Sequence, residues 1–218
     1  MKILLLGATG RTGRHVLSEA LQNGLEVNCL VRDPKKVKSS STRLKLFDGN
    51  PGNASDLEQA IDGCHAIINV LNISRHSDWP WSKLRTPETF LSDVTTHLIR
   101  LAERHNIKRI VSCSAWGAGD TKKDLPGWFL WLIDHSNVGY AYRDHERQEE
   151  LLKKSNLSWT IVRPTGLSDF KKYQAVTESY NNVPKPRMMI TRRTVARYLV
   201  EALSNDGLIR KAPTISGK

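Results

Sequence analysis

The sequence lacks several features that mark whole classes of protein. No apolar run approaches the roughly 18 residues of a membrane-spanning helix, and the run from Ile3 to Leu6 is too short for the core of a signal peptide. We therefore expect a cytoplasmic protein with no membrane contact. The three cysteines have no Cys-x-x-Cys spacing and the seven histidines no His-Glu-x-x-His motif. These absences predict buried free thiols and no metal site.

Acidic residues are also scarce, at 22 against 33 lysines and arginines, which gives a net charge of +11. The basic residues are interleaved with acids along the chain, so they predict a basic surface or sites for anionic ligands and no nucleic-acid-binding face. No linker rich in proline, glycine or serine divides the 218 residues. We expect a single α/β domain over residues 1–218, with a small-molecule substrate, as a monomer or homodimer.

The first fourteen residues, MKILLLGATGRTGR, place three glycines between an apolar strand and a helical pattern. Gly7 lets the chain turn sharply out of the strand, Gly10 lets the main chain approach a diphosphate, and Gly13 lets the helix lie close to the sheet. No Gly-Lys-Ser/Thr follows, which disfavours a mononucleotide P-loop. The turn therefore predicts a dinucleotide site at the N-terminus of the helix, and an ordinary strand-to-helix turn is the alternative. Its other members are Thr9, Arg11 and Thr12.

Apolar runs and helical patterns alternate along the rest of the chain. Strands are expected at 2–6, 26–31, 44–47, 66–71, 109–112 and 159–163, and helices from 13 to a stop at 23–24, at 56–61, from a cap at Thr86 to about 104, at 143–154 and at 194–203. This order predicts a Rossmann fold with a doubly wound, mostly parallel sheet. Ligands of such a sheet bind at the carboxyl ends of its strands. Two stretches expected to be irregular, about 72–86 and 115–142, hold five of the six tryptophans and could cover a substrate.

The second strand ends in Val31-Arg32-Asp33, which bears on the choice between NAD and NADP. An acid at this place binds the adenosine ribose hydroxyls of NAD, whereas the 2′-phosphate of NADP needs cations. Arg32 can form a forked contact with a phosphate and Arg11 can add a second one, so we expect NADP. Asp33 keeps NAD possible, and both arginines could instead be solvated. Further cofactor contacts are expected after the other strands, from Asp48, Gly49, Leu71, Asn72, Ser112, Pro164 and Thr165.

Five segments carry a family resemblance: GATGRTGRHVL, LVRDPKKV, LEQAIDGCHAIINVL, RIVSCSAWGAG and EELLKKSNLSWTIVRPTGLSD. Together they resemble the atypical short-chain dehydrogenase/reductase family with an NAD(P)H-binding domain, near its NmrA-like proteins and its biliverdin reductase B or flavin reductase group. The resemblance covers nearly the whole chain. It implies a Rossmann fold that binds NADP and, in the reductase group, hydride transfer from NADPH to a flavin, a quinone or a related conjugated acceptor.

The expected catalytic residues depart from the pattern of that superfamily, which pairs a serine after the fifth strand with Tyr-x-x-x-Lys. Ser114 fits the serine, but neither Tyr140 nor Tyr142 is followed four residues later by a lysine. His145 matches the position from which a helix side chain faces the nicotinamide in the biliverdin reductase B-like pattern. Ser114, His145 and Tyr142 are therefore the candidate catalytic residues.

Reduction of a conjugated acceptor does not require the Tyr-Lys pair, because stacking brings the two rings together and the proton can come from solvent. The sequence thus predicts an NADP-dependent reductase of a flavin, a quinone or a related conjugated or carbonyl compound. One alternative is a non-catalytic NADP-binding redox sensor of the NmrA-like type. Another is a nucleotide-sugar epimerase or dehydratase, which the missing pair disfavours. The apolar run at 126–133 predicts a packed lid helix, with a substrate wall or a partner surface as alternatives.

Overall fold

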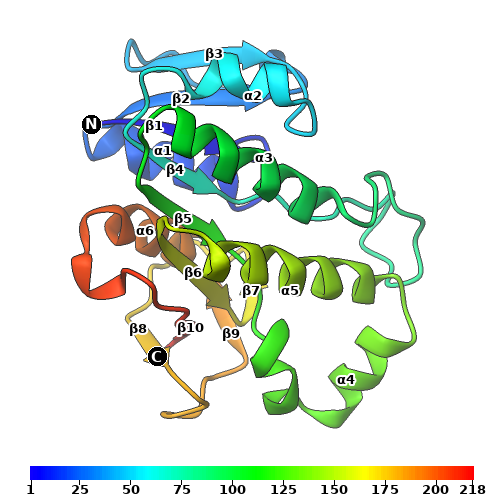
Figure 1. The fold of residues 1–218 in the computed structure, drawn as a ribbon. Helices are drawn as coiled ribbons and strands as arrows, with labels where there is room; N and C mark the ends of the chain where they lie inside the picture. The colour runs from blue at the N-terminus through cyan, green and yellow to red at the C-terminus, as the bar shows by residue number, and fades with distance from the viewer.

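Eight strands form the central sheet, in the order β3-β2-β1-β4-β5-β6-β10-β8 (Figure 1). They were located in a computed structural model that describes all residues, 1–218. Neighbouring strands are parallel except for β10 and β8. The bounds are β1 Lys2–Leu6, β2 Glu26–Val31, β3 Leu44–Asp48, β4 Ala66–Asn69, β5 Arg109–Cys113, β6 Ser158–Pro164, β8 Val176–Ser179 and β10 Thr214–Gly217. Two more short strands, β7 Gly166–Ser168 and β9 Met189–Thr191, pair only with each other.

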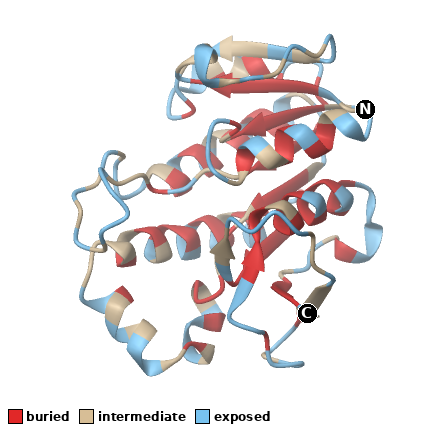
Figure 2. Ribbon diagram, turned by 180° about the vertical axis from the view of Figure 1, so that it is seen from behind, coloured by how far each residue is buried: buried red, intermediate tan, exposed pale blue.

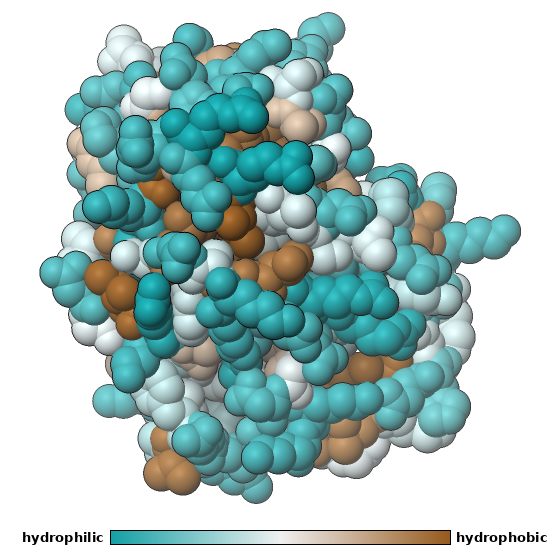
Figure 3. All heavy atoms as spheres, viewed as in Figure 1, coloured by the Kyte–Doolittle hydropathy of each residue, from teal (hydrophilic) through white to brown (hydrophobic).

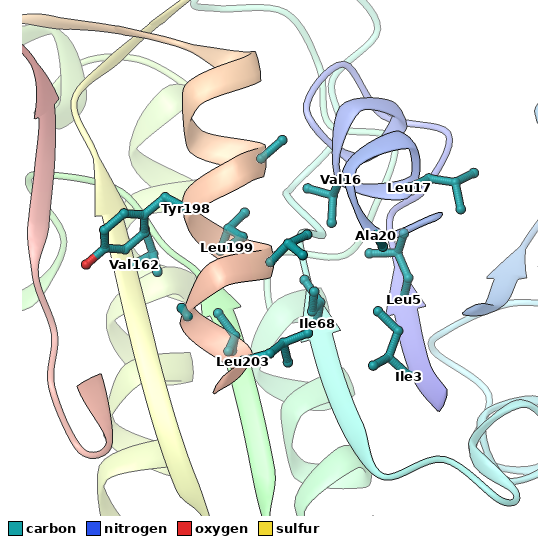
Figure 4. Close-up of a cluster of buried hydrophobic side chains, with 14 of the residues drawn as sticks. Ile3, Leu5, Val16, Leu17, Ala20, Ile68, Val162, Tyr198, Leu199 and Leu203 are labelled. Carbon is teal, nitrogen blue, oxygen red and sulfur yellow. The ribbon is translucent and has the colours of Figure 1, made fainter. Parts of the chain in front are cut away.

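Helices cover both faces of this sheet. The α-helices are α1 Gly13–Gln22, α2 Ala54–Ile61, α3 Phe90–Arg104, α4 Gly127–Asp134, α5 Val138–Lys154 and α6 Arg192–Glu201, and the 3-10 helices are η1 Pro34–Lys36, η2 Gly119–Asp124, η3 Ala202–Ser204 and η4 Asp206–Leu208. On one face, Val16 of α1 and Leu199 of α6 pack over the strands (Figure 4). On the other, Leu57 of α2, Leu98 of α3 and Leu152 of α5 are fully buried. Figure 2 shows the result, with central strands buried and outer helices exposed on one side.

The order of the strands reverses at β1, which lies between β2 and β4. Leu6 at the end of β1 pairs with Leu30 of β2 and with Asn69 of β4, and Asn69 in turn pairs with Ser112 of β5. The carboxyl ends of these strands therefore meet along one edge of the sheet, as a parallel doubly wound fold requires. The predicted fold class is confirmed.

Helix α3 begins at Phe90, later than the predicted start after Thr86. The reason lies in another helix. Asp144 of α5 is fully buried, and its carboxylate accepts the Leu91 N–H at 2.6 Å and the Ser92 hydroxyl at 2.6 Å. This carboxylate caps the first turn of α3 and is favoured there by the positive end of the helix dipole. A cap from a residue so distant in sequence leaves no local signal.

The stretch 115–142, predicted as irregular, contains η2, α4 and the first turn of α5. Helix α5 starts at Val138, earlier than the predicted Arg143. The sequence did not reveal this start, because the first residues of α5 include a glycine and two tyrosines, which are weaker helix formers than the residues after them. Helix α4 lies in the apolar run at 126–133, with Ile133 buried and Trp128 and Trp131 exposed.

Hydrophilic side chains cover most of the face that carries α3 and α5, with small hydrophobic patches between them (Figure 3). None of the helices combines the length and the apolar character needed to cross a bilayer. All three thiols are free, and Cys29 and Cys64 are buried as predicted, whereas Cys113 is half-buried.

Candidate functional site

The glycine turn between β1 and α1 has no space for side chains at its two ends. Gly7 has a φ of +86°, and a Cβ added there would lie 2.8 Å from the Val70 carbonyl oxygen. A Cβ added at Gly13 would lie 1.9 Å from the Gly7 carbonyl oxygen. The turn is therefore folded onto itself and onto the end of β4, which only glycine allows.

Free hydrogen-bond donors lie where this turn enters α1. The backbone N–H groups of Arg11, Thr12 and Gly13 donate to no acceptor of the chain. Thr12, the residue before the helix, supplies no side-chain cap either. A helix start with uncapped N–H groups and the positive end of its dipole favours an anion such as a pyrophosphate.

Buried polar groups without partners continue the site along the same edge of the sheet. They are Asn69 Nδ2 at the end of β4, Ser112 Oγ in β5 and Thr165 Oγ1 just after β6. Each of these residues is less than 5% exposed. Buried polar atoms are normally hydrogen-bonded, so this row fits a ligand with its own hydroxyl and amide groups. Together with the glycine turn, the row fits a dinucleotide whose nicotinamide half reaches β6. Asn69 was not expected from the sequence, although a polar residue that ends a buried apolar strand is a signal.

The end of β2 presents one free cation and one occupied carboxylate. Arg32 is exposed and pairs with no other side chain. The Asp33 carboxylate instead accepts the Lys35 N–H at 3.1 Å and lies 3.5 Å from Lys36 Nζ. Asp33 is thus engaged by the turn η1, while the Arg32 guanidinium is available to an incoming group.

A groove of about 640 Å³ lies between α1 and residues 36–43, next to Thr9 of the glycine turn. Every charged residue that lines it is basic, namely Arg14, Lys36, Lys38 and Arg43. This lining suits a phosphate group. Arg14 and Lys36 were not expected as site residues, although the run Lys35-Lys36-Val37-Lys38 is a signal for the lysine.

Four other predicted cofactor contacts lie at the end of β3, which is Asp48, or in the loops that follow β3 and β4, at the same edge of the sheet. Asp48 is exposed, and the Gly49 N–H donates to the Val31 carbonyl oxygen at 3.0 Å, which joins the ends of β2 and β3. Leu71 is half-buried and Asn72 exposed. Their roles, and that of Pro164, which ends β6, stay predictions.

Arg11 of the glycine turn pairs with a carboxylate from the stretch that follows β4. Its guanidinium donates two hydrogen bonds to the Asp78 carboxylate, at 3.0 and 3.1 Å. Asp78 belongs to the stretch 72–86 that follows β4. The pair therefore links the glycine turn to this stretch and directs Arg11 toward it.

The three candidate catalytic side chains have different partners. The Ser114 hydroxyl donates to Glu149 Oε1 at 2.7 Å, and Ser114 is 5% exposed. His145 is buried with its Nδ1 3.2 Å from Gln148 Oε1, and burial lowers the pKa of its imidazole. The Tyr142 ring meets Phe129 edge-on, and burial raises the pKa of its phenol to about 12. At neutral pH the imidazole and the phenol are both uncharged, and no hydrogen bond joins any two of the three side chains.

A second cavity, of about 550 Å³, lies at the end of β6, and we call it the acceptor-side cavity. Trp116 lies on one side of it, and the Trp116 backbone N–H donates to the Pro164 carbonyl oxygen at 3.0 Å. Met188 lies on the other and accepts the Gly166 N–H at 2.8 Å. Both sides are thus bonded to the end of β6, where Pro164 and Thr165 were expected as cofactor contacts. The lining residues are Trp116, Asp124, Leu125, Pro126, Lys185, Pro186, Arg187 and Met188. The first four lie in the stretch 115–142, which was expected to cover a substrate, whereas residues 185–188 were not expected from the sequence.

Comparisons with known proteins agree with this geometry. The photosystem II assembly factor Ycf39 of Trieres chinensis is 28% identical over 181 residues, which are 83% of this chain and 49% of that protein. The chain thus spans about half the length of this relative.

Solved structures match over nearly the full chain. ChuY of Escherichia coli O157:H7, described as an anaerobillin reductase, has a TM-score of 0.80 at 20% identity, over 100% of this chain and 97% of that one. A short-chain dehydrogenase/reductase of Veillonella parvula DSM 2008 in complex with NADP has a TM-score of 0.76 at 16% identity, over 99% and 94%. Identities this low show a shared fold.

A family model described as NAD(P)H-binding matches residues 7–206. The chain belongs to this NAD(P)H-binding family, which confirms the resemblance drawn from its motifs.

Proposed function

We propose that the protein is an NADPH-dependent reductase of a flat, conjugated acceptor. The observation that carries the proposal is the adjacency of two features at one edge of the sheet. One is the glycine turn with its free N–H groups and the row of unpartnered polar atoms. The other is the acceptor-side cavity, whose two sides hydrogen-bond to residues 164–166. A cofactor along this row would place its nicotinamide end beside the cavity.

The charges at the end of β2 support NADP over NAD. A ribose 2′-hydroxyl is bound by a carboxylate, but the Asp33 carboxylate accepts the Lys35 backbone N–H and lies 3.5 Å from Lys36 Nζ, so part of its accepting capacity is used within the chain. A 2′-phosphate is bound by cations, and Arg32 is unpaired. Lys36 and Arg14 line the adjoining groove and add positive charge.

The state of Ser114 supports a conjugated acceptor over a simple carbonyl. When bound, NADPH supplies a hydride from its nicotinamide. A carbonyl substrate also needs a donor on its oxygen, and the Ser114 hydroxyl proton is already donated to Glu149. Near pH 7 the Tyr142 phenol stays protonated and the His145 imidazole stays neutral. We therefore propose that these two side chains line the site and supply no charge. Solvent can protonate a reduced flavin or quinone.

The lining of the acceptor-side cavity supports an acceptor with an anionic group. Trp116 forms part of the lining although the residue is only 5% exposed, and the two cations Lys185 and Arg187 outnumber the one carboxylate, Asp124. Flavin mononucleotide combines a flat ring system with a phosphate and is the first acceptor to test.

The test is NADPH oxidation against a panel of flavins, quinones and aldehydes, with NADH run in parallel. We expect turnover with flavins or quinones, little with aldehydes, and a preference for NADPH. A protein that binds NADPH at micromolar concentration and reduces no acceptor would refute the reductase function.

A second candidate function is a redox sensor that binds NADP and a partner protein. It is favoured by the exposure of Trp79, Trp81, Trp128 and Trp131, since large exposed aromatic side chains are typical of partner surfaces. Trp81 donates its indole N–H to the His135 carbonyl oxygen at 2.7 Å, so the two tryptophan-bearing segments are joined. A sensor would bind NADPH and NADP⁺ with different affinities and would not oxidise NADPH in the presence of acceptors.

A further inference from the structure

Arg163 is a buried cation that two carboxylates share. It lies in β6 and is 3% exposed. Its Nε donates to Glu149 Oε1 at 2.9 Å, and Nη2 also bonds Glu149 Oε2. On its other side, Nη1 and Nη2 donate to the two oxygens of Asp120 at 3.3 and 2.5 Å. A guanidinium that forks to two carboxylates is held in both position and plane.

The two carboxylates come from different parts of the fold. Glu149 lies on α5 and is 1% exposed, whereas Asp120 lies on η2 and its side chain is 59% exposed. Lys153 of α5 adds a second cation, 3.2 Å from Glu149 and 3.7 Å from Asp120. The cluster holds two positive and two negative groups, so burial leaves no net charge uncompensated. Its effect is to bind η2 to the body of the protein.

Helix η2 is the middle of one wall of the acceptor-side cavity. Trp116 precedes it, and Leu125 and Pro126 follow it. We call residues 116–126 the cavity wall. The wall is attached to β6 at one end by the bond from the Trp116 N–H to the Pro164 carbonyl oxygen. The Asp120 carboxylate is its ionic attachment to β6, one residue before Pro164.

Electrostatics shows that this attachment persists. Burial would raise the pKa of the Asp120 carboxyl, but Arg163 and Lys153 hold that pKa below its usual value. Burial works against the Arg163 charge, yet Glu149 and Asp120 raise the pKa of the guanidinium. Both groups therefore stay charged through the range in which the protein would work.

We propose that Asp120 is a positioning residue for the acceptor: through Arg163 it fixes the cavity wall against the end of β6. This inference rests on the proposed reductase function. Asp120 bonds to none of the predicted cofactor contacts, although two of them, Pro164 and Thr165, directly follow Arg163 in the chain. Loss of its charge would therefore loosen the wall and weaken acceptor binding, while the cofactor site keeps its shape.

The test compares Asp120→Asn with Asp134→Asn. The control removes the Lys122–Asp134 ion pair, 2.8 Å long and exposed, which also begins on η2 but does not reach β6. For Asp120→Asn we expect the KM for flavin mononucleotide to rise about 3- to 10-fold, with kcat and the NADPH Kd within about 2-fold of wild type. Asp120→Glu should recover part of the KM. Asp134→Asn should resemble wild type.

Hydrogen exchange gives a readout that needs no turnover. Amide hydrogens of residues 116–126 should exchange faster in Asp120→Asn than in wild type, and their exchange rates should be unchanged in Asp134→Asn. The proposal is overturned if exchange in the wall is the same in both variants, or if it rises without a change in KM. It is also overturned if kcat falls and NADPH binding weakens by a similar factor as the KM rises, since that pattern indicates general unfolding. Should the wild type reduce no acceptor, the reductase function fails, and the exchange data alone still decide whether Asp120 fixes the wall.

Discussion

Substitution of Gly13 by alanine would test the glycine turn as the cofactor cradle. The new Cβ would lie 1.9 Å from the Gly7 carbonyl oxygen, whereas ordinary contact begins at 3.4 Å. The turn and the start of α1 must therefore separate by the difference, about 1.5 Å. Overpacking of this kind costs about 1–3 kcal/mol of unfolding free energy. The shift also moves the free N–H groups of Arg11 and Thr12, so the NADPH Kd should rise at least about tenfold.

Gly127→Ala is a matched control, because Gly127 is also the first residue of a helix, α4. A Cβ there would meet nothing within 4 Å. Alanine restricts the unfolded chain more than glycine, so this variant should be unchanged or up to about 1 kcal/mol more stable. The two substitutions thus have opposite expected signs. Urea unfolding measures stability, and quenching of intrinsic fluorescence measures NADPH binding. Wild-type NADPH affinity in Gly13→Ala would refute the cradle.

Three further predictions concern single side chains. Arg32→Ala should raise the NADPH Kd about 10- to 100-fold and leave the NADH Kd within about 2-fold, as measured by calorimetric titration; equal losses for both cofactors would refute the 2′-phosphate contact. Asp144→Asn should lower the unfolding free energy by about 2–3 kcal/mol, because it removes the buried cap of α3, whereas Asp93→Asn, an exposed acid in the same first turn, should cost less than about 1 kcal/mol. Burial lowers the pKa of His145 below its ordinary value of 6.5, so the unfolded state binds more protons as the pH falls through about 6.5, and stability is lost there. His145→Gln should therefore flatten the fall in unfolding free energy between about pH 7 and about pH 5, and an unchanged slope would contradict this assignment.

Much of the fold could be predicted because its signals are local. The buried runs of β1 and β4, the glycine turn and the stop at Gly24 are each set by residues within a few positions. The start of α3 could not be predicted, since Asp144 caps it from another helix. Strands β8 and β10 were not predicted, because each has only four residues and so shows little alternation of apolar and polar positions.

The candidate site divides in the same way. Gly7, Gly13 and Arg32 could be proposed as site residues because the backbone geometry and the charge at the ends of the first two strands depend on adjacent residues. The acceptor-side cavity could not, because Trp116, Lys185 and Arg187 meet there from distant segments. The hydrogen bond from Ser114 to Glu149 could not be predicted either, since the two residues are 35 positions apart in the chain. Such pairs follow from tertiary packing alone.

The most direct test of the reductase account is a single turnover. Protein with NADPH bound in equal amount is mixed with excess flavin mononucleotide in the absence of oxygen, and the decay of the reduced nicotinamide absorbance is followed. The account predicts decay much faster than in a mixture without protein, and slower decay when NADH replaces NADPH. Decay at the rate of the mixture without protein, although NADPH is bound, would contradict it.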